Sequence, residues 1–259
     1  MENFEDKYGN LCYFDVLNGW ISSKGHAKGS NSKYGFYSAS MENNLNEVIE
    51  TPFSEVVRKL KMHFSNLSLE DLKEPPDLLL TTKDIYACRL FLYSLLARDD
   101  STIQEAKKSS KYYSSFPFLY SDQVINDSVV SVALNNQLEK DELKEYKMLL
   151  LINVTDNPFI LANVGVGLVS VYGARCYFIP ITPTLAIGFI EPTDYTKSLN
   201  TKIIKIIIVD GPYADFLNVV SMKQQMSLNH GYVYANNRDS LQRALDDCKK
   251  DGYRNVDTK

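Results

Sequence analysis

The sequence has few cysteines, no long apolar run and no basic leader. Its four cysteines stand singly, without a C-x-x-C pair, which indicates free thiols in a reducing cytoplasm and argues against a disulfide framework or a zinc knuckle. No apolar run approaches the roughly 20 residues that a membrane helix needs. The residues from Met1 to Asp6 lack the basic and apolar regions of a signal peptide. We therefore expect a cytoplasmic protein with no membrane partner.

The sequence also lacks an excess of positive charge. The net charge is −4 at pH 7, whereas nucleic-acid binders usually carry a basic balance, so composition argues against a nucleic-acid partner. One run is the exception: Lys107, Lys108 and Lys111 precede Tyr112 and Tyr113, and such a mixture could bind single-stranded nucleic acid. The alternative interpretation is a solvated helix end.

The three histidines, His26, His63 and His230, lie far apart in the sequence. They do not predict a metal site by themselves, although carboxylates could supplement them. His230 follows the last long predicted helix, and we keep it as a candidate ligand-binding residue.

The pattern of apolar residues predicts an α+β fold. A hydrophobic content of 44% over 259 residues suits a globular protein with a large core. Helical periodicity occupies residues 40–138, short apolar runs occupy 148–248, and a charged segment at 139–147 separates them. We expect one compact domain with a possible seam at 139–147, in which a helix-rich half packs on an antiparallel or mixed sheet. Asn18-Gly19 between two aromatic segments predicts an additional N-terminal β-hairpin.

Two helices in the first half carry candidate site residues. The first begins near Ser40, and its apolar stripe continues through Pro52, which either kinks the helix or starts a second one capped by Thr51. Glu47 and Glu50 lie beside this stripe. They are either a solvated acidic flank or catalytic carboxylates.

The second helix begins at a predicted capping box formed by Thr81 and Asp84, and it is apolar on nearly all sides up to Ala97. Arg89 interrupts this apolar surface and requires an acceptor, because an unpaired buried charge is costly. Arg98 follows the helix, where a cation can cap the last turn or bind an anionic ligand.

The second half reads as strands. Short runs rich in Ile, Val, Tyr and Phe are separated by Gly, Pro and Asn. Connections at Gly165 to Gly167 and at Gly173 to Arg175 are too short for crossover helices, so hairpins are expected there. A helix from about Tyr213 to Leu228 should bury Phe216, and Gly231 suits a left-handed cap. The predicted strands span 148–154, 166–172, 176–181, 186–190 and 203–209.

The run that begins at Met148 stops abruptly at Thr155-Asp156-Asn157-Pro158. Asp and Asn hydrogen-bond their own backbone in turns, and proline keeps the preceding residue out of a helix. A rigid acid and amide pair, Asp156 and Asn157, is therefore expected at the end of a central strand. Such a pair forms either a site or an ordinary turn.

Several of these segments together resemble a bacterial family catalogued as domain of unknown function 4238, which has no assigned activity to carry over. Members show an opening His-x-x-Pro-x-x-Tyr element that this sequence lacks, with Phe4 at its last position. The resemblance implies either a relative without that histidine or a protein that starts upstream of Met1. The matching segments, in order, are Gly9–Asp15, Gly35–Tyr37, Glu47 or Glu50, Arg98, Thr155–Pro158, Pro180–Pro183, Asn218 and Tyr232–Tyr234.

Two functions fit these residues. The first is a ligand- or partner-binding or sensing protein whose 17 tyrosines line the recognition surface. The alternative is a metal-assisted hydrolase or nuclease of the mobile-element or defence kind, in which carboxylates hold Mg²⁺ and an arginine clamps a phosphate. Its catalytic candidates are Asp156, Asn157, Glu47 and Glu50, and its anion-binding candidates are Arg89 and Arg98.

Overall fold

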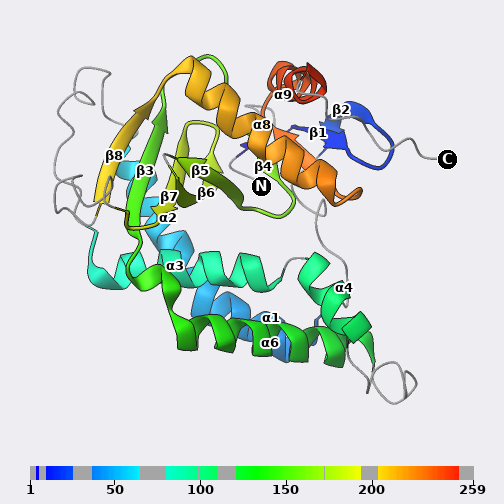
Figure 1. The fold of residues 1–259 in the computed structure, drawn as a ribbon, viewed down its shortest axis with the longest axis vertical. Helices are drawn as coiled ribbons and strands as arrows, with labels where there is room; N and C mark the ends of the chain where they lie inside the picture. Colours follow the sequence, from blue (N-terminus) through cyan, green and yellow to red (C-terminus); the bar gives the residue numbers. More distant parts are fainter. Residues whose placement is uncertain are drawn as a thin grey trace. The chain divides into compact units, whose positions relative to one another are not determined.

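The computed structural model has the α+β architecture that the sequence predicts, with helices and two separate sheets (Figure 1). It describes residues 4–5, 10–25, 37–64, 80–98, 100–109, 121–171, 173–193 and 204–250. The predictions for His26, Gly35-Phe36 and Lys111 lie outside these residues. The chain divides into two compact units, one of residues 33–144 and the other of residues 1–32 with 145–259. The boundary between residues 144 and 145 falls within the segment 139–147.

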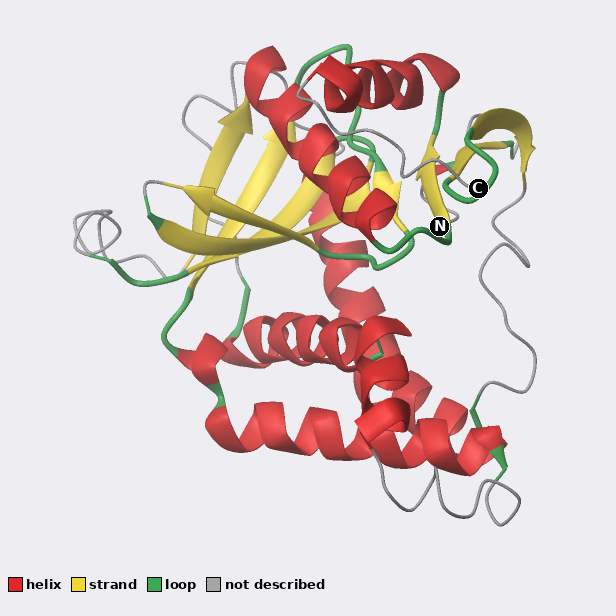
Figure 2. Cartoon of the chain, turned by 45° about the vertical axis from the view of Figure 1, so that its right-hand side comes forward, coloured by secondary structure: helices red, strands yellow, loops and turns green. Residues whose placement is uncertain are grey.

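The helical unit contains no strand among its described residues (Figure 2). Serine side chains begin two of its helices: Ser38 accepts a hydrogen bond from the Met41 amide, and Ser121 accepts one from the Val124 amide. Its elements are α1 (Ala39–Leu45), η2 (Asn46–Glu50), α2 (Thr51–Phe64), α3 (Thr82–Ala97), α4 (Asp100–Ser109), α6 (Asp122–Lys140) and η3 (Glu142–Lys144).

A π-helical turn, η2, joins α1 to α2 without a break. Pro52 has no N–H and its ring would collide with a carbonyl one turn back, so the wider turn accommodates it. Thr51 has helical dihedral angles, φ −63° and ψ −51°, so a new helix capped by Thr51 is the wrong alternative. The wider turn also shifts the apolar stripe: Ile49 and Phe53 are buried, whereas Val48 is exposed.

Helix α3 begins with the predicted capping box, which the structure confirms. The Thr81 hydroxyl accepts a hydrogen bond from the Asp84 amide, and the Asp84 carboxylate accepts one from the Thr81 amide at 2.9 Å. Lys59 on α2 lies 2.6 Å from the same carboxylate. The ring of Phe53 stacks on Phe91 at 3.8 Å, which ties α2 to the middle of α3.

The sheet unit holds nine described strands and two described helices. Its five-stranded sheet has the order β5-β6-β7-β3-β8, and its four-stranded sheet has the order β2-β1-β9-β4. The elements are β1 (Leu11–Asp15), β2 (Trp20–Gly25), β3 (Lys147–Asn153), β4 (Leu161–Ala162), β5 (Gly167–Val171), β6 (Ala174–Thr182), β7 (Leu185–Ile190), β8 (Ile204–Val209), α8 (Gly211–Ser227), β9 (Tyr232–Ala235) and α9 (Arg238–Lys250).

Strand β3 is an interior strand of the five-stranded sheet, as its apolar run predicts. It pairs antiparallel with β7 and parallel with β8, so the sheet is mixed. All of its residues from Met148 to Asn153 are buried, which explains why the run is continuously apolar instead of alternating.

The four-stranded sheet contains the predicted N-terminal hairpin, β1 with β2, and two further strands whose pairing with it was not predicted. Strand β9 pairs antiparallel with β1, and β4 pairs with β9. The hairpin expected at Gly173 joins β5 to β6. The hairpin expected at Gly165 is wrong, because β4 and β5 belong to different sheets. The chain crosses from one sheet to the other at that point.

Helix α8 contributes to the cores of both sheets. Leu217 packs with β3 and β6, whereas Met222 packs with β1, β9 and α9. Figure 1 shows α8 running past the five-stranded sheet toward β4 and α9. Two details differ from the sequence prediction: Phe216 is 43% exposed, and the left-handed residue directly after the helix is Asn229, with φ 55°. None of the helices that the structure describes is long and apolar enough to cross a membrane.

The capping box predicts a pH-dependent contribution of Asp84 to stability. Burial raises the pKa of this carboxyl, but hydrogen bonds from Lys59 and Thr81 outweigh burial, so the pKa lies below its ordinary value of 3.8. A lowered native pKa stabilises the fold above the unfolded pKa, and this contribution is lost as the pH falls through the native pKa. We expect Asp84→Asn to be less stable than wild type in urea at neutral pH, and the difference to shrink below about pH 4. A difference that stays constant with pH would contradict this explanation.

Candidate functional site

The corner that follows β3 is built around the buried side chain of Asn153. Its amide donates to the Asn157 carbonyl at 2.8 Å, and its side-chain oxygen accepts from the Thr155 amide at 3.0 Å and the Thr155 hydroxyl at 2.7 Å. The Asn157 amide N–H in turn donates to the Thr155 hydroxyl at 3.2 Å. These bonds close a rigid turn at the end of the parallel pair β3 and β8.

Within this corner the two predicted site residues behave differently. Asn157 is 5% exposed, and its side-chain amide donates to Asp215 on α8. Its side-chain oxygen is buried with no hydrogen-bond partner among the described residues. Asp156 is exposed, and no described residue makes a polar contact with its carboxylate. The corner thus combines one scaffolding amide with one free surface acid.

Helix α8 holds the segment after this corner through two amides that the sequence analysis did not single out as site residues. Asn218 donates to the Pro158 carbonyl at 2.8 Å and accepts from the Ile160 amide at 3.0 Å. Gln225 accepts from the Val164 amide at 3.1 Å and donates to the His230 carbonyl at 2.8 Å. Both side chains are buried. The one sequence signal for Asn218 and Gln225 is that each is a polar residue in a helix whose neighbouring buried positions are mostly apolar.

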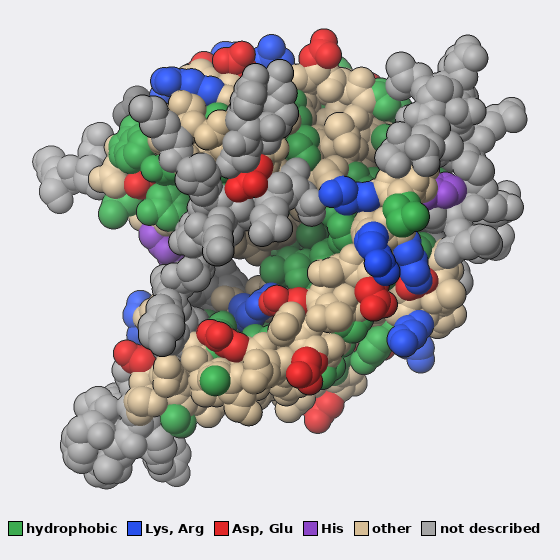
Figure 3. All heavy atoms as spheres, turned by 180° about the vertical axis from the view of Figure 1, so that it is seen from behind, with side chains coloured by type: hydrophobic (Ala, Val, Ile, Leu, Met, Phe, Trp, Pro, Cys, Tyr) green, Lys and Arg blue, Asp and Glu red, His purple; other side chains and the backbone are tan. Residues whose placement is uncertain are grey.

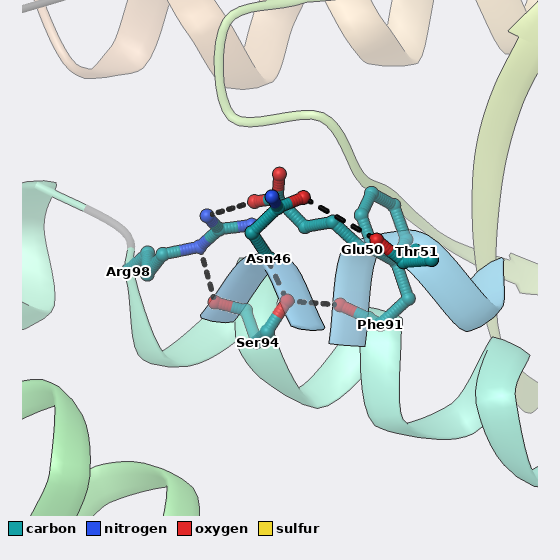
Figure 4. A network of polar contacts seen from close by, with 6 residues as sticks. All are labelled: Asn46, Glu50, Thr51, Phe91, Ser94 and Arg98. Atoms are coloured by element: carbon teal, nitrogen blue, oxygen red, sulfur yellow. Dashed lines mark hydrogen bonds and ion pairs between the residues drawn. The ribbon is translucent and has the colours of Figure 1, made fainter. Parts of the chain in front are cut away.

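In the helical unit, Arg98 and Glu50 form an ion pair of 2.7 Å between Nη1 and Oε1 (Figure 4). The guanidinium also donates to the Ser94 carbonyl and to the Ser94 hydroxyl, each at 3.3 Å. Arg98 therefore caps the end of α3 while it binds a carboxylate from η2. Glu50 is 42% exposed, and Glu47 is exposed.

Arg89 faces the last turn of α6. Its Nη1 lies 3.8 Å from the Asp141 carboxylate, and its guanidinium lies 5.8 Å from the centroid of the Tyr86 ring. Its Nε is buried and has no hydrogen-bond partner within the described part of the chain. Tyr93 donates to Asp141 at 3.2 Å and accepts from the Leu143 amide at 2.9 Å. Burial, reinforced by the Asp141 charge, raises the pKa of the Tyr93 hydroxyl to about 12. These contacts fix the turn at Asp141, where φ is 38°.

The remaining candidate binding residues are His230 and the two described lysines, Lys107 and Lys108. His230 has its Nδ1 at 2.7 Å from the Leu228 carbonyl, in the turn before β9. Lys107 lies 3.3 Å from the Asp122 carboxylate, and Lys108 is exposed. Over the ranges that the structure describes, no group of three or more His, Cys, Asp or Glu side chains could hold a metal ion. Asp156 and Asn157 belong to the sheet unit, whereas Glu47, Glu50, Arg89 and Arg98 belong to the helical unit.

A cluster of aromatic side chains on the four-stranded sheet was not predicted as a site. Tyr13, Trp20 and Tyr232 come from β1, β2 and β9, and we call them the aromatic face. The Tyr13 ring lies 5.5 Å from the Trp20 ring and 5.5 Å from the Tyr232 ring. Trp20 is 46% exposed, and the two tyrosines are half-buried. Figure 3 shows hydrophobic side chains, in green, gathered at the left edge where this hairpin lies.

The alternation of aromatic residues in the two terminal segments is the signal that could have indicated this face. Tyr13 and Asp15 share one side of β1, and Tyr232 and Tyr234 share one side of β9. These aromatic residues come together because β1 pairs with β9. That pairing joins segments from the two ends of the chain and cannot be inferred from either segment alone.

Comparison of the chain with known proteins found no matching family model, curated protein or solved structure.

The corner predicts different effects for two neighbouring substitutions. Asn153→Ala removes three hydrogen bonds and leaves the Thr155 amide without its side-chain acceptor, so we expect a loss of about 3 kcal/mol in the free energy of unfolding. Asp156→Ala removes an exposed carboxylate and should change stability by less than about 0.5 kcal/mol. Urea denaturation of both variants provides the comparison. An Asp156 variant as unstable as the Asn153 variant would show that the acid also belongs to the scaffold.

The ion pair between Glu50 and Arg98 predicts a weak coupling. Because Glu50 is 42% exposed, water screens the pair, and a double-mutant cycle with Glu50→Ala and Arg98→Ala should give less than about 1 kcal/mol. Arg98→Ala alone should cost more than Glu50→Ala, because it also removes the bonds to Ser94. A coupling above about 2 kcal/mol would contradict the solvent-screened pair and indicate a desolvated one.

Proposed function

We propose that the protein is a binding or sensing protein that recognises a ligand or partner through its aromatic face. The observation that carries this proposal is the contact of three aromatic rings, Tyr13, Trp20 and Tyr232, on a sheet surface where the tryptophan remains 46% exposed. Tyr and Trp combine a large apolar area with few rotatable bonds, so they bind partners at a low cost in conformational entropy.

The polar corner also supports this proposal, because its amides serve as scaffold. Asn153, Asn157 and Asn218 use their amides to hold backbone and Asp215, which is what the binding hypothesis expects of a turn that acts as scaffold. The hydrolase or nuclease alternative, with Mg²⁺ bound at Asp156, stays a prediction of the sequence. The cytoplasmic location is likewise a proposal, supported by four free and buried cysteines.

Membership of the family called domain of unknown function 4238 is a further proposal. Its support is the order of the matching segments, of which Thr155–Pro158 forms the corner and Tyr232–Tyr234 lies in β9. The family brings architecture and no activity, so the resemblance adds no support to the proposed function.

Trp20 is the only tryptophan in the chain, and this permits a direct test. Protein labelled with 5-fluorotryptophan gives a single ¹⁹F resonance, which can be followed during titration with three probes: polyproline peptide, oligothymidylate and chitotriose. We expect at least one probe to shift this resonance saturably in the wild type and not in Tyr232→Ala. No shift with any probe, or an equal shift in the variant, would contradict recognition at this face.

Stability provides the control for this test. Because Trp20 is about half exposed, Trp20→Ala should lower the free energy of unfolding by only about 1 kcal/mol, well below the cost of truncating a buried aromatic residue. If Trp20→Ala lowered the free energy of unfolding as much as truncation of a core residue, the aromatic face would have a structural role instead.

A further inference from the structure

We propose that Asn18 is a deamidation site that Asp15 keeps unreactive while the β1–β2 hairpin is closed, and that its product opens the hairpin. The modification converts the side-chain amide of Asn18 to a carboxylate. This inference goes beyond the proposed function and does not depend on it. It follows from the hydrogen bonds of the hairpin turn, from the burial of Asp15 and from the position of β2 in its sheet.

The turn of this hairpin requires a residue pair that is chemically reactive. Asp15 pairs with Trp20, so residues 16–19 form the loop between β1 and β2. Gly19 has φ 70°, in the left-handed region that favours glycine. An asparagine followed by glycine deamidates readily, because glycine has no Cβ to hinder ring closure. Asn18-Gly19 is the only Asn-Gly pair in the sequence.

The reaction joins two groups of this pair. The backbone nitrogen of Gly19 loses its proton and attacks Cγ of Asn18, so a new N–C bond closes a cyclic imide. The bond between Cγ and Nδ2 breaks, and Nδ2 takes up the proton and leaves as ammonia. Water then opens the imide and leaves aspartate or isoaspartate at position 18. Solvent water is therefore the only co-reactant.

In the closed turn Asp15 holds both reacting groups. The Gly19 N–H donates to the backbone carbonyl of Asp15 at 2.8 Å, and Nδ2 of Asn18 donates to Oδ2 of Asp15 at 2.8 Å. The backbone N–H of Asn18 donates to the other carboxylate oxygen at 3.0 Å. The Gly19 nitrogen must give up its bond before it can attack, and Nδ2 must give up its bond before it can leave. The closed turn therefore slows the reaction.

The burial of Asp15 strengthens this protection. Asp15 is 7% exposed, so little water competes for its carboxylate, and hydrogen bonds to an ionised acceptor are stronger than neutral ones. Asn18 and Gly19 are themselves exposed. Water thus has access to the reactive pair, and the contacts with Asp15 limit the reaction.

Strand β2 is the part of the hairpin that can open. It is the terminal strand of the order β2-β1-β9-β4, and β1 is its one strand partner in the described sheet. The pairing is also irregular between Leu11 and Tyr13. Edge segments with few partners open at a lower free energy than the whole fold. Each opening frees the Gly19 N–H and the Asn18 amide, so the rate of deamidation follows the fraction of time that the hairpin is open.

The product does not fit the closed turn. A carboxylate at position 18 has no N–H to donate, and it would place an oxygen where Nδ2 now lies 2.8 Å from Oδ2 of Asp15. Two carboxylates at such a distance repel each other, and more strongly where one of them is shielded from water. Deamidation therefore converts an attraction that closes the hairpin into a repulsion that opens it. Because ammonia is released, the change is irreversible.

Mass spectrometry of the full-length protein tests the protection. The protein is incubated in mildly alkaline buffer with and without urea, and the peptide that contains residue 18 is examined for deamidation. We expect native wild type to react at least about tenfold more slowly than the protein in urea. Folded Asp15→Ala should react at least about threefold faster than native wild type. Asp15→Asn, which keeps the size and one acceptor oxygen, should fall between them.

A second carboxylate that caps a turn provides the matched control. Asp210 accepts a hydrogen bond from the Tyr213 amide at 3.0 Å at the start of α8. Asp210→Ala should leave the rate of deamidation at residue 18 unchanged. Circular dichroism shows whether each variant is folded.

Hydrogen exchange tests the effect of the product. Asn18→Asp carries the charge that deamidation creates, whereas Asn18→Ala removes the same donor without adding charge. We expect the amides of β2 to exchange at least about tenfold faster in Asn18→Asp than in Asn18→Ala, with the interior amides of β3 unchanged in both.

Three results would overturn the inference. Native and urea-unfolded wild type would deamidate at the same rate, or both Asp15 variants would be folded and react no faster than wild type. The third is equal exchange of the β2 amides in Asn18→Asp and Asn18→Ala, which would show that the new charge does not open the hairpin. None of these results bears on recognition at the aromatic face.

Discussion

Two buried amides on α8 hold together the part of the protein on which the rest of the sheet unit depends. After β3 the chain leaves the five-stranded sheet, and it enters the four-stranded sheet at β4. The residues from Asn157 to Ile160 in between are buried and lie outside the strands, and unpaired buried N–H and C=O groups are costly. Asn218 pairs with the groups of Pro158 and Ile160, and Gln225 pairs with those of Val164 and His230. The two residues lie two helical turns apart, so one face of α8 holds the chain both before and after β4.

This arrangement explains why the aromatic face can be rigid although its strands are short. Strand β4 has two residues and β9 has four, which is little for an independent sheet. Gln225 fixes the turn that leads into β9, and the Val16 amide donates to the Gly231 carbonyl in that turn at 3.1 Å. Gly231 has φ 82° and a Cβ there would lie 2.7 Å from the Gln225 amide nitrogen, so the turn requires glycine. The position of Tyr232 beside Tyr13 follows from these contacts.

The sequence predicted most elements of this fold and little of their pairing. The strands between 148 and 209 agree with the structure within about two residues, because continuous apolar runs bounded by Gly and Pro are a local signal. The pairing of β1 with β9 joins residues from opposite ends of the chain and has no local signal. At Pro52 the sequence left open a kink or a second helix, and helical periodicity alone could neither choose between them nor predict the π-helical turn.

The candidate site shows the same limit. Asp156 and Asn157 were singled out because they are turn formers, and the turn exists. Asn153, which organises it, stands inside an apolar run and looks like a minor interruption. Asn218 was noted only through the family resemblance, and nothing in the sequence assigned it a bonding partner. Residues whose task is to satisfy distant backbone groups are identified by their partners, and those partners are set by tertiary structure.

Hydrogen exchange at the Ile160 and Val164 amides tests most directly whether α8 holds the crossing between the sheets. Both amides donate to buried side chains of α8, so the account predicts protection comparable to that of the interior amides of β3. It also predicts that Asn218→Ala lowers the protection of Ile160 more than that of β3. Fast exchange of both amides in the wild type, at the rate of an exposed loop, would contradict it.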